Sequence, residues 1–560
     1  MKIYSPWAEI DNEGAIALNP RLDTLEGKTI GLYAHFKGHS PIMLQVVADL
    51  LHERYPTTKF KAIQLKIDTA EAVNIPEFDA ELKEWLKDVD GVITAYGDMG
   101  SCAMFHAYNT AYVERLGKPT VMICNEDLLP AAKKGASCRQ CPNLRFVCTT
   151  LPDMSWFPAI DAGVINGMMR PAFSACLDEI IDGLTKPLTE EEKAIVTRSN
   201  SEAEPFEVDS LDGISDLFYK RGWTTGQPIV APTEEAVENM LRGTDLPRDY
   251  VVGLIPPMNG KATVEKIAVN AVMAGCLPTY LPVLISAVRA TLNPIIHLEG
   301  WTCSRASWFP LITVSGKVAK EIGVYSGLAS YSKASSTIAR AYTYMIMNIS
   351  GVRPAIEDLS EPGHECRQGV CIGENTEASP WEPLHVRFGV AAEDSAVSVF
   401  WPEERVEGHG GTVKECFNTM FRINYSGYDK GVCYVVTPGF AETLVKAGFH
   451  SQQEVLDYVK EYCRQPASEV AYRWLIGSNH LPKGVVLPVD QEHDTVRRFW
   501  TTDHMFIVVC GETAGAGATC ITLAGGGEHG GPASAKIDLP ANWDALLAEY
   551  ADVKPTYHNY

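Results

Sequence analysis

Hydrophobic positions in the first part of the chain come in strand-length runs separated by longer runs with helical spacing. The strand-length runs are Lys28–Tyr33, Phe60–Lys66, Val89–Asp98 and Pro119–Cys124. The helix-like segments between them are Pro41–Glu53, Asp79–Lys87 and Ala103–Leu116. Strands that alternate with helices form parallel sheets whose faces are covered by those helices. The sequence therefore predicts an open parallel sheet flanked by helices, an α/β fold of the flavodoxin or Rossmann type.

The pattern changes further along the chain. Residues 188–212 are rich in glutamate and serine, which is typical of a linker, with room for one short helix. We expect a first domain over residues 1–187 and a larger second domain over residues 213–560. Its strand candidates are Val251–Ile255, Leu311–Val314, Ser395–Phe400, Val432–Val436 and Met505–Cys510. Its helix candidates include Thr233–Leu241, Thr263–Ala274, Pro282–Leu292 and Ser335–Ile349. This mixture indicates an α/β or α+β domain of unpredicted topology.

One cysteine lies where a predicted strand meets a predicted helix. The strand Val89–Asp98 continues through Met99 and Gly100 into Ser101 and Cys102. Backbone N–H groups converge at a helix N-terminus, and the helix dipole favours negative charge there. A thiolate, the reactive form of cysteine, should therefore form more easily here than on an ordinary cysteine. We interpret Cys102 as a candidate nucleophile or proton shuttle.

Other polar residues follow the predicted strands. Ligands of open parallel sheets bind outside the carboxyl ends of the strands, and these ends carry His35, Asp98 and Glu126. Each could orient or deprotonate the Cys102 thiol, although Asp98 could instead cap the helix. Ser101 is also a candidate, but a cap or turn role suits it better than a nucleophilic one.

Two more histidines lie close to these positions in sequence. His39 is in the same strand-end loop as His35, and His106 is one helical turn after Cys102. Either could act as a base near neutral pH. A solvated position at the surface is the preferred interpretation of all three histidines.

Cys138 and Cys141 form a Cys-x-x-Cys pair, with Cys148 nearby. Such a pair can perform dithiol redox chemistry or supply half of a metal site. No second Cys-x-x-Cys exists, so zinc or an iron–sulfur cluster is not favoured and we expect no cofactor. A resolving role beside Cys102 and a purely structural loop stay open. The preceding residues 131–137 are expected to form a mobile loop that could bring this pair over Cys102.

The second domain offers candidate substrate contacts. Lys261 and Thr263 stand between a predicted strand and a predicted helix, a position that suits a carboxylate or phosphate. Arg340 lies on a helix that begins in a serine-rich segment, and Asn375 and His385 lie in a polar and aromatic loop. We expect these five residues to line an anion-binding pocket. Glu265 and Asn270 lie on the helix that follows Thr263 and are further candidates, with salt bridging as the alternative.

Composition limits the possible partners and the compartment. The formal net charge of −22 opposes binding to nucleic acid or an anionic membrane. We find neither an uninterrupted apolar run of about 18 residues nor the apolar core of a secretory signal at the start. The 15 cysteines are scattered through the chain, unlike a small disulfide scaffold. We expect a cytoplasmic protein that acts on a small molecule.

The segment Tyr96–Cys102, with its Gly-Ser-Cys turn, resembles the motif of the UGSC family. The spacing to Glu114–Thr120 and the closing Ile180–Thr185 also match, and the resemblance covers about residues 25–187. The first motif position, cysteine or selenocysteine in the family, is Met99 here, so Cys102 is the thiol that carries over. Residues Lys261–Cys276 and Glu374–Leu384 resemble the long partner domain found fused or adjacent to such domains.

These observations lead to three hypotheses about function. The first is a cysteine-dependent enzyme for a small carboxylated substrate, with addition–elimination as the reaction type. That type covers lyase, hydratase and carbon–sulfur bond chemistry and needs only one thiol. The second is a thiol–disulfide oxidoreductase that uses Cys102 with Cys138 or Cys141. The third is a non-enzymatic metal- or ligand-binding subunit. A homodimer is the default expectation for the assembly.

Overall fold

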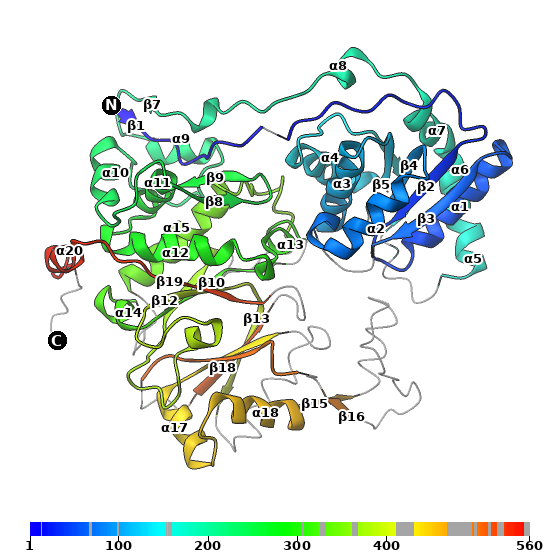
Figure 1. Ribbon diagram of the computed structural model, residues 1–560. Helices are drawn as coiled ribbons and strands as arrows, with labels where there is room; N and C mark the ends of the chain where they lie inside the picture. The colour runs from blue at the N-terminus through cyan, green and yellow to red at the C-terminus, as the bar shows by residue number, and fades with distance from the viewer. Residues whose placement is uncertain are drawn as a thin grey trace.

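The computed structural model describes residues 1–12, 14–65, 70–97, 100–152, 154, 160–304, 307–324, 332–360, 368–409, 431–466, 495–497, 501–512, 517–523 and 531–553. Asp98 and Met99 lie outside the described residues. The chain is arranged as a parallel α/β unit and a larger mixed α/β region beside it (Figure 1).

The N-terminal unit is built on a five-stranded parallel sheet. Its strands are β2 (Thr29–Ala34), β3 (Lys59–Gln64), β4 (Gly91–Gly97), β5 (Thr120–Asn125) and β6 (Phe146–Thr149). They follow the order β3-β2-β4-β5-β6, and all neighbouring pairs are parallel. Numbered within the sheet, this is the 2-1-3-4-5 order of flavodoxin-like folds. The predicted α/β architecture is confirmed, and β6 adds a strand that the sequence pattern did not reveal.

Helices cover both faces of this sheet. Apolar residues of α1 (Ser40–Arg54) and α7 (Leu177–Thr185) pack with Ile93 and Val121 on one face. Residues of α2 (Pro76–Leu86) pack on the other. That second face also carries α3 (Gly100–Arg115) and α4 (Leu129–Cys138). The mobile loop expected over residues 131–137 is wrong, because these residues are helical in α4.

The larger region contains two four-stranded sheets. The first has the order β11-β10-β12-β19, and the second has the order β13-β18-β14-β17. The strands of the first are β10 (Leu311–Ser315), β11 (Val370–Gly373), β12 (Ala396–Phe400) and β19 (Ala533–Lys536). Those of the second are β13 (Pro402–His409), β14 (Val432–Val436), β17 (Met505–Val509) and β18 (Gly517–Leu523). All five strands predicted in this region are present, as β8 (Val251–Ile255), β10, β12, β14 and β17.

Apolar helices form the core beside the first of these sheets. They are α11 (Val264–Ala274), α12 (Leu281–Thr291) and α15 (Lys333–Asn348). Two amphipathic helices, α17 (Pro438–Lys446) and α18 (Gln452–Tyr462), pack on β14 and β17. Within the described residues, no single helix meets the length and hydropathy required to cross a membrane. Two consecutive helical segments, Pro278–Thr291 and Pro294–Thr302, reach this length and hydropathy only when they are taken together, and they are bent by 78° relative to each other.

The first residues of the chain lie on the larger region. Strand β1 (Lys2–Ile3) pairs antiparallel with β7 (Phe206–Glu207), which follows the short helix α8 (Glu190–Lys193) in the segment predicted as a linker. Ala8 N–H donates to Asn348 O at 3.0 Å. In Figure 1 the chain then runs from these contacts across to the parallel sheet. The two parts are therefore joined by two chain segments that run side by side.

Candidate functional site

Cys102 lies in the first turn of α3, directly beyond the end of β4. The thiol is buried, with 5% of the residue exposed. Strand and helix come very close at Gly97, where a Cβ atom would lie 2.9 Å from Met122 Cε and 3.2 Å from Ala103 Cα. A larger residue at this position would force Met122 and the start of α3 to shift, so glycine suits the tight passage from strand to helix. The predicted placement of Cys102 at a helix N-terminus is confirmed.

The topology makes this edge of the sheet a binding position. Strands β2 and β4 are neighbours, but the helices that follow them, α1 and α3, cover opposite faces of the sheet. Such a reversal opens a crevice at the carboxyl ends of the two strands, where ligands bind in open α/β folds. His35 follows β2 and Cys102 follows β4. The structure thus brings together two residues that are far apart in the sequence.

The loop after β2 is fastened to the end of β4. His35 N–H donates to Ala95 O and to Ser40 Oγ, both at 2.9 Å. Ser40 Oγ in turn donates to Ala95 O. These contacts fix the backbone of His35 beside the strand that leads to Cys102.

Three imidazoles near this edge are buried. His35 and His106 are each 1% exposed, and His39 is 4% exposed. The rings of His35 and His106 pack edge to face, with 5.5 Å between their centres, and His106 also contacts Tyr33. The expectation that these histidines are solvated is wrong, because the sheet and neighbouring segments cover α3 on several sides.

Positions along α3 relate Cys102 to the histidine pair and to the larger region. Residues three and four positions further along a helix flank a given side chain. For Cys102 these are Phe105 and His106. Phe105 packs against His297 of the larger region with 5.6 Å between ring centres, and His297 packs against Trp301. Sequence reasoning missed His297, since it comes from a segment almost two hundred residues later in the chain.

Comparison with known families agrees with this geometry. Residues 2–157 match the model of the UGSC family. These residues form a UGSC domain. The match begins with β1 and ends beyond β6, so it includes the whole parallel sheet and the Cys102 turn. A comparison with curated proteins gives no match to this chain.

The UGSC domain is fastened to the larger region by a buried cation. Arg139, directly after α4, is 8% exposed. Its guanidinium lies 2.6 Å from a Glu71 carboxylate oxygen and 2.7 Å from one of Glu299. It also donates to Pro257 O at 2.9 Å and stacks 3.8 Å from the centre of the Tyr108 ring. Burial raises the pKa of Glu299, while the Arg139 charge acts in the opposite direction.

A second buried ion pair lies in the same interface. Lys134 of α4 is 2.5 Å from Glu357, whose side chain is fully buried. Apolar residues of α3 and α4 also share one hydrophobic core with residues of α11, α12 and α15. The larger region is therefore a fixed neighbour of the helix that carries Cys102.

The other candidate site residues of the UGSC domain differ in their exposure to solvent. Ser101 is partly exposed on α3, beside Cys102 in sequence. Glu126 is exposed in the turn that follows β5. Asp98 lies outside the described residues, so its proposed role stays a prediction.

The Cys-x-x-Cys pair is buried. Cys138 ends α4, and its sulfur is 3.7 Å from Met258 Sδ of the larger region. Burial raises the pKa of the Cys138 thiol and raises that of Cys141 to about 12. In the part of the chain that the structure describes, no three His, Cys, Asp or Glu side chains are grouped as a metal site requires.

The candidate substrate residues of the larger region lie in three places. Lys261 pairs with Glu9 at 3.7 Å, and the Thr263 hydroxyl caps α11 by accepting from Lys266 N–H at 3.1 Å. Arg340 donates to Tyr344 Oη at 2.9 Å and to Pro228 O.

The other two candidates, Asn375 and His385, lie near β11 and β17. Asn375 donates to Gly511 O at 3.0 Å. His385 is fully buried, with Nε2 3.1 Å from Ala391 O, and burial lowers its pKa. Each of the five therefore takes part in contacts that hold the fold, and their role in substrate binding stays a prediction.

Proposed function

We propose that this chain is a cysteine-dependent enzyme that acts on a small carboxylated substrate by addition–elimination. Cys102 is the nucleophile or proton shuttle. One observation supports the proposal most strongly. Cys102 lies in the first turn of a helix at the reversal point of a flavodoxin-like sheet, and the buried His106, one helical turn further along, packs against His35.

The residues at this edge suit thiol chemistry. The N-terminal N–H groups and dipole of α3 favour the thiolate of Cys102. An imidazole can take up the thiol proton and return it. In the elimination direction, the Cys102 thiolate takes the proton from the carbon next to the carboxylate, a carbon–carbon double bond forms, and the group on the adjacent carbon leaves with the proton of the imidazolium. The thiol then passes its proton to the imidazole, which restores the starting pair, and addition is the same sequence in reverse.

Backbone N–H groups at the start of α3 also suit the substrate carboxylate, because a helix N-terminus favours an anion. They lie at the same edge as Cys102, whereas Lys261 and Arg340 hold contacts elsewhere in the larger region. The proposal therefore rests on the UGSC domain. The larger region contributes by covering the Phe105 side of α3 and so shielding the site from water.

The redox alternative is less well supported. Thiol–disulfide exchange requires a thiolate as the attacking group. Burial raises the pKa of both Cys138 and Cys141, so both are protonated near neutral pH. We further propose a reducing cytoplasmic location, because buried thiols such as Cys124, Cys276 and Cys371 stay reduced there.

Cysteine alkylation with mass spectrometry tests the proposal. The full-length protein is treated with iodoacetamide between pH 5 and 10, and the modification rate of each cysteine is followed by peptide. We expect Cys102 to react with an apparent pKa at least one unit below the ordinary value of about 8.5. Cys138 and Cys141, whose pKa is raised by burial, serve as controls and should react far more slowly than Cys102.

Substrate class is tested in the same assay. Small unsaturated carboxylates, such as fumarate and crotonate, should slow the alkylation of Cys102, while their amides should have a weaker effect. A Cys102 that reacts with an ordinary or raised pKa in the folded protein would contradict a catalytic thiol. Cys102→Ser should remove the fast-reacting site without changing the far-ultraviolet circular dichroism spectrum.

A further inference from the structure

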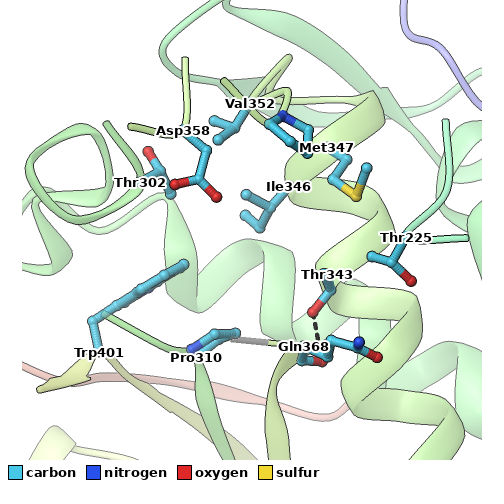
Figure 2. A pocket seen from close by; sticks show the side chains of 11 residues that line it. Thr225, Thr302, Pro310, Thr343, Ile346, Met347, Val352, Asp358, Gln368 and Trp401 are labelled. Atoms are coloured by element: carbon cyan, nitrogen blue, oxygen red, sulfur yellow. Dashed lines mark hydrogen bonds between the residues drawn. The ribbon is translucent and has the colours of Figure 1, made fainter. Parts of the chain in front are cut away.

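A cavity opens in the larger region beside the C-terminal half of α15 (Figure 2). Its volume is about 130 Å³. Small-molecule sites combine apolar walls with a few polar groups, and an engineered apolar cavity of about 150 Å³ binds benzene. The size of this cavity therefore suits a ligand built on one small ring.

The walls of the cavity are mainly apolar. Ile346 and Met347 face it from α15, and Val352 follows that helix. Trp401, which follows β12, closes the opposite side. All four residues are at most 7% exposed. A ligand in this space must carry an apolar body to replace the contacts that these side chains lack.

One charged side chain lines the cavity among the residues that the structure describes, and it is an acid. Figure 2 shows the Asp358 carboxylate and Thr302 on one side of Ile346. One Asp358 oxygen accepts the Ser360 N–H at 3.0 Å. An ionised carboxylate has about four acceptor positions, so it can accept a ligand donor in addition to its protein partners.

A second polar group points to a ligand. Thr225 lines the cavity on the side of Met347. Its hydroxyl oxygen is buried and has no hydrogen-bond partner within the described part of the chain. Buried polar groups nearly always have a partner, so an unsatisfied hydroxyl at a cavity wall needs an explanation. A donor or acceptor on a bound molecule would satisfy it.

We propose that this cavity binds a small amine with an apolar body. The ammonium group donates to Asp358, a charge-assisted hydrogen bond. The apolar body lies between Met347 and Trp401, whose aromatic face also favours a neighbouring cation. An anion is disfavoured, because it would face a carboxylate with no basic side chain among the described lining residues. This site is separate from Cys102 and does not depend on the proposed reaction.

Three probes of equal size and different charge test the proposal. Benzylamine, benzyl alcohol and benzoate are titrated into the full-length protein at pH 7, with binding followed by isothermal calorimetry and ligand-observed NMR. We expect benzylamine to bind at least tenfold more tightly than benzoate, with benzyl alcohol in between. Benzoate that binds as tightly as benzylamine would overturn the proposal.

Variants locate the binding. Asp358→Asn should weaken benzylamine at least tenfold and change benzyl alcohol by less than twofold. Met347→Trp should fill the cavity and abolish the binding of all three probes. Asp216→Asn, an exposed acid on α9 (Ile214–Lys220), and Cys102→Ser are matched controls that should keep full affinity.

Should Met347→Trp fail to fold, Thr225→Val replaces it, with an expected loss of at least threefold for benzylamine. Benzylamine affinity that is unchanged in Asp358→Asn would overturn the proposal, whatever the other variants do.

Discussion

The two regions of this protein use their buried polar side chains in different ways. In the UGSC domain, Cys102, His35 and His106 gather at one edge of the parallel sheet. In the larger region, Lys266 donates to Ser5 O and Ala203 O, and Glu374 accepts the Leu384 N–H. The first set is concentrated at the carboxyl edge of the sheet, where ligands bind in open α/β folds, and the second is dispersed among backbone partners. The proposed function therefore rests on position at a strand end more than on residue type.

The largest expected effect concerns the join between the regions. Arg139→Met removes the cation between Glu71 and Glu299 and leaves the buried Glu299 carboxylate without its ion-pair partner. Breaking a buried pair in this way costs about 3–5 kcal/mol. Urea unfolding followed by circular dichroism measures the loss. The matched control is Arg242→Met, which breaks the half-exposed pair with Glu549 and should cost far less, because water screens exposed ion pairs. An equal cost for both variants would show that the regions are held together without the buried cation.

The second-largest expected effect is a pH dependence of stability that arises from Glu374 in the larger region. Burial raises the pKa of Glu374 from 4.5 to about 7. The folded protein therefore binds this proton more tightly than the unfolded chain, and stability falls as pH rises from about 4.5 to 7. A shift of this size corresponds to roughly 3 kcal/mol.

Comparing the wild type with Glu374→Gln isolates this contribution. The free energy of unfolding of the wild type should fall relative to the variant between pH 4.5 and 7.5, and then stay level. Denaturant titrations across that range provide the measurement. If the free energies of unfolding of the two proteins changed in parallel with pH, the pKa of Glu374 in the folded protein would be ordinary.

The smallest expected effect concerns the alkylation rate of Cys102 at the carboxyl edge of the UGSC sheet. His106→Asn should lower the alkylation rate of Cys102 at pH 7 about tenfold and raise its apparent pKa, since a nearby imidazole favours the thiolate. His35→Asn should have a smaller effect, because its ring reaches Cys102 through His106. His52→Asn, exposed on α1, is the matched control. An unchanged pH profile in His106→Asn would remove this imidazole from the proposed chemistry.

The fold of the UGSC domain was largely predictable, because four of its five strands are apolar runs. Strand β6 was missed, since its four residues are too few to show a pattern. Residues 131–137 were predicted to form a mobile loop, but they lie in helix α4. Gly135 allows close packing of α4 on α3, where a Cβ atom would lie 2.7 Å from Met104 O.

The candidate site was predicted in part. Cys102 and His35 could be placed at the sheet edge from strand ends alone, because parallel strands share one carboxyl edge. The burial of His106 could not be predicted, since it depends on tertiary packing. Its flanking residues Phe105 and Ala107 were the available signal. Glu299 and His297 are contributed by a distant segment, and spacing within one sequence does not reveal such partners.

The pairing of β1 with β7 also has a consequence for synthesis. Residues 2 and 3 leave the ribosome early, but their partners Phe206 and Glu207 follow about two hundred residues later. At the usual rate of about 5–20 residues per second, the N-terminal strand waits roughly 10–40 seconds for its partner. The contact of Ala8 with Asn348 forms later still. The parallel sheet can thus be complete before the first residues of the chain find their place, so the oldest part of the polypeptide is among the last to be fixed.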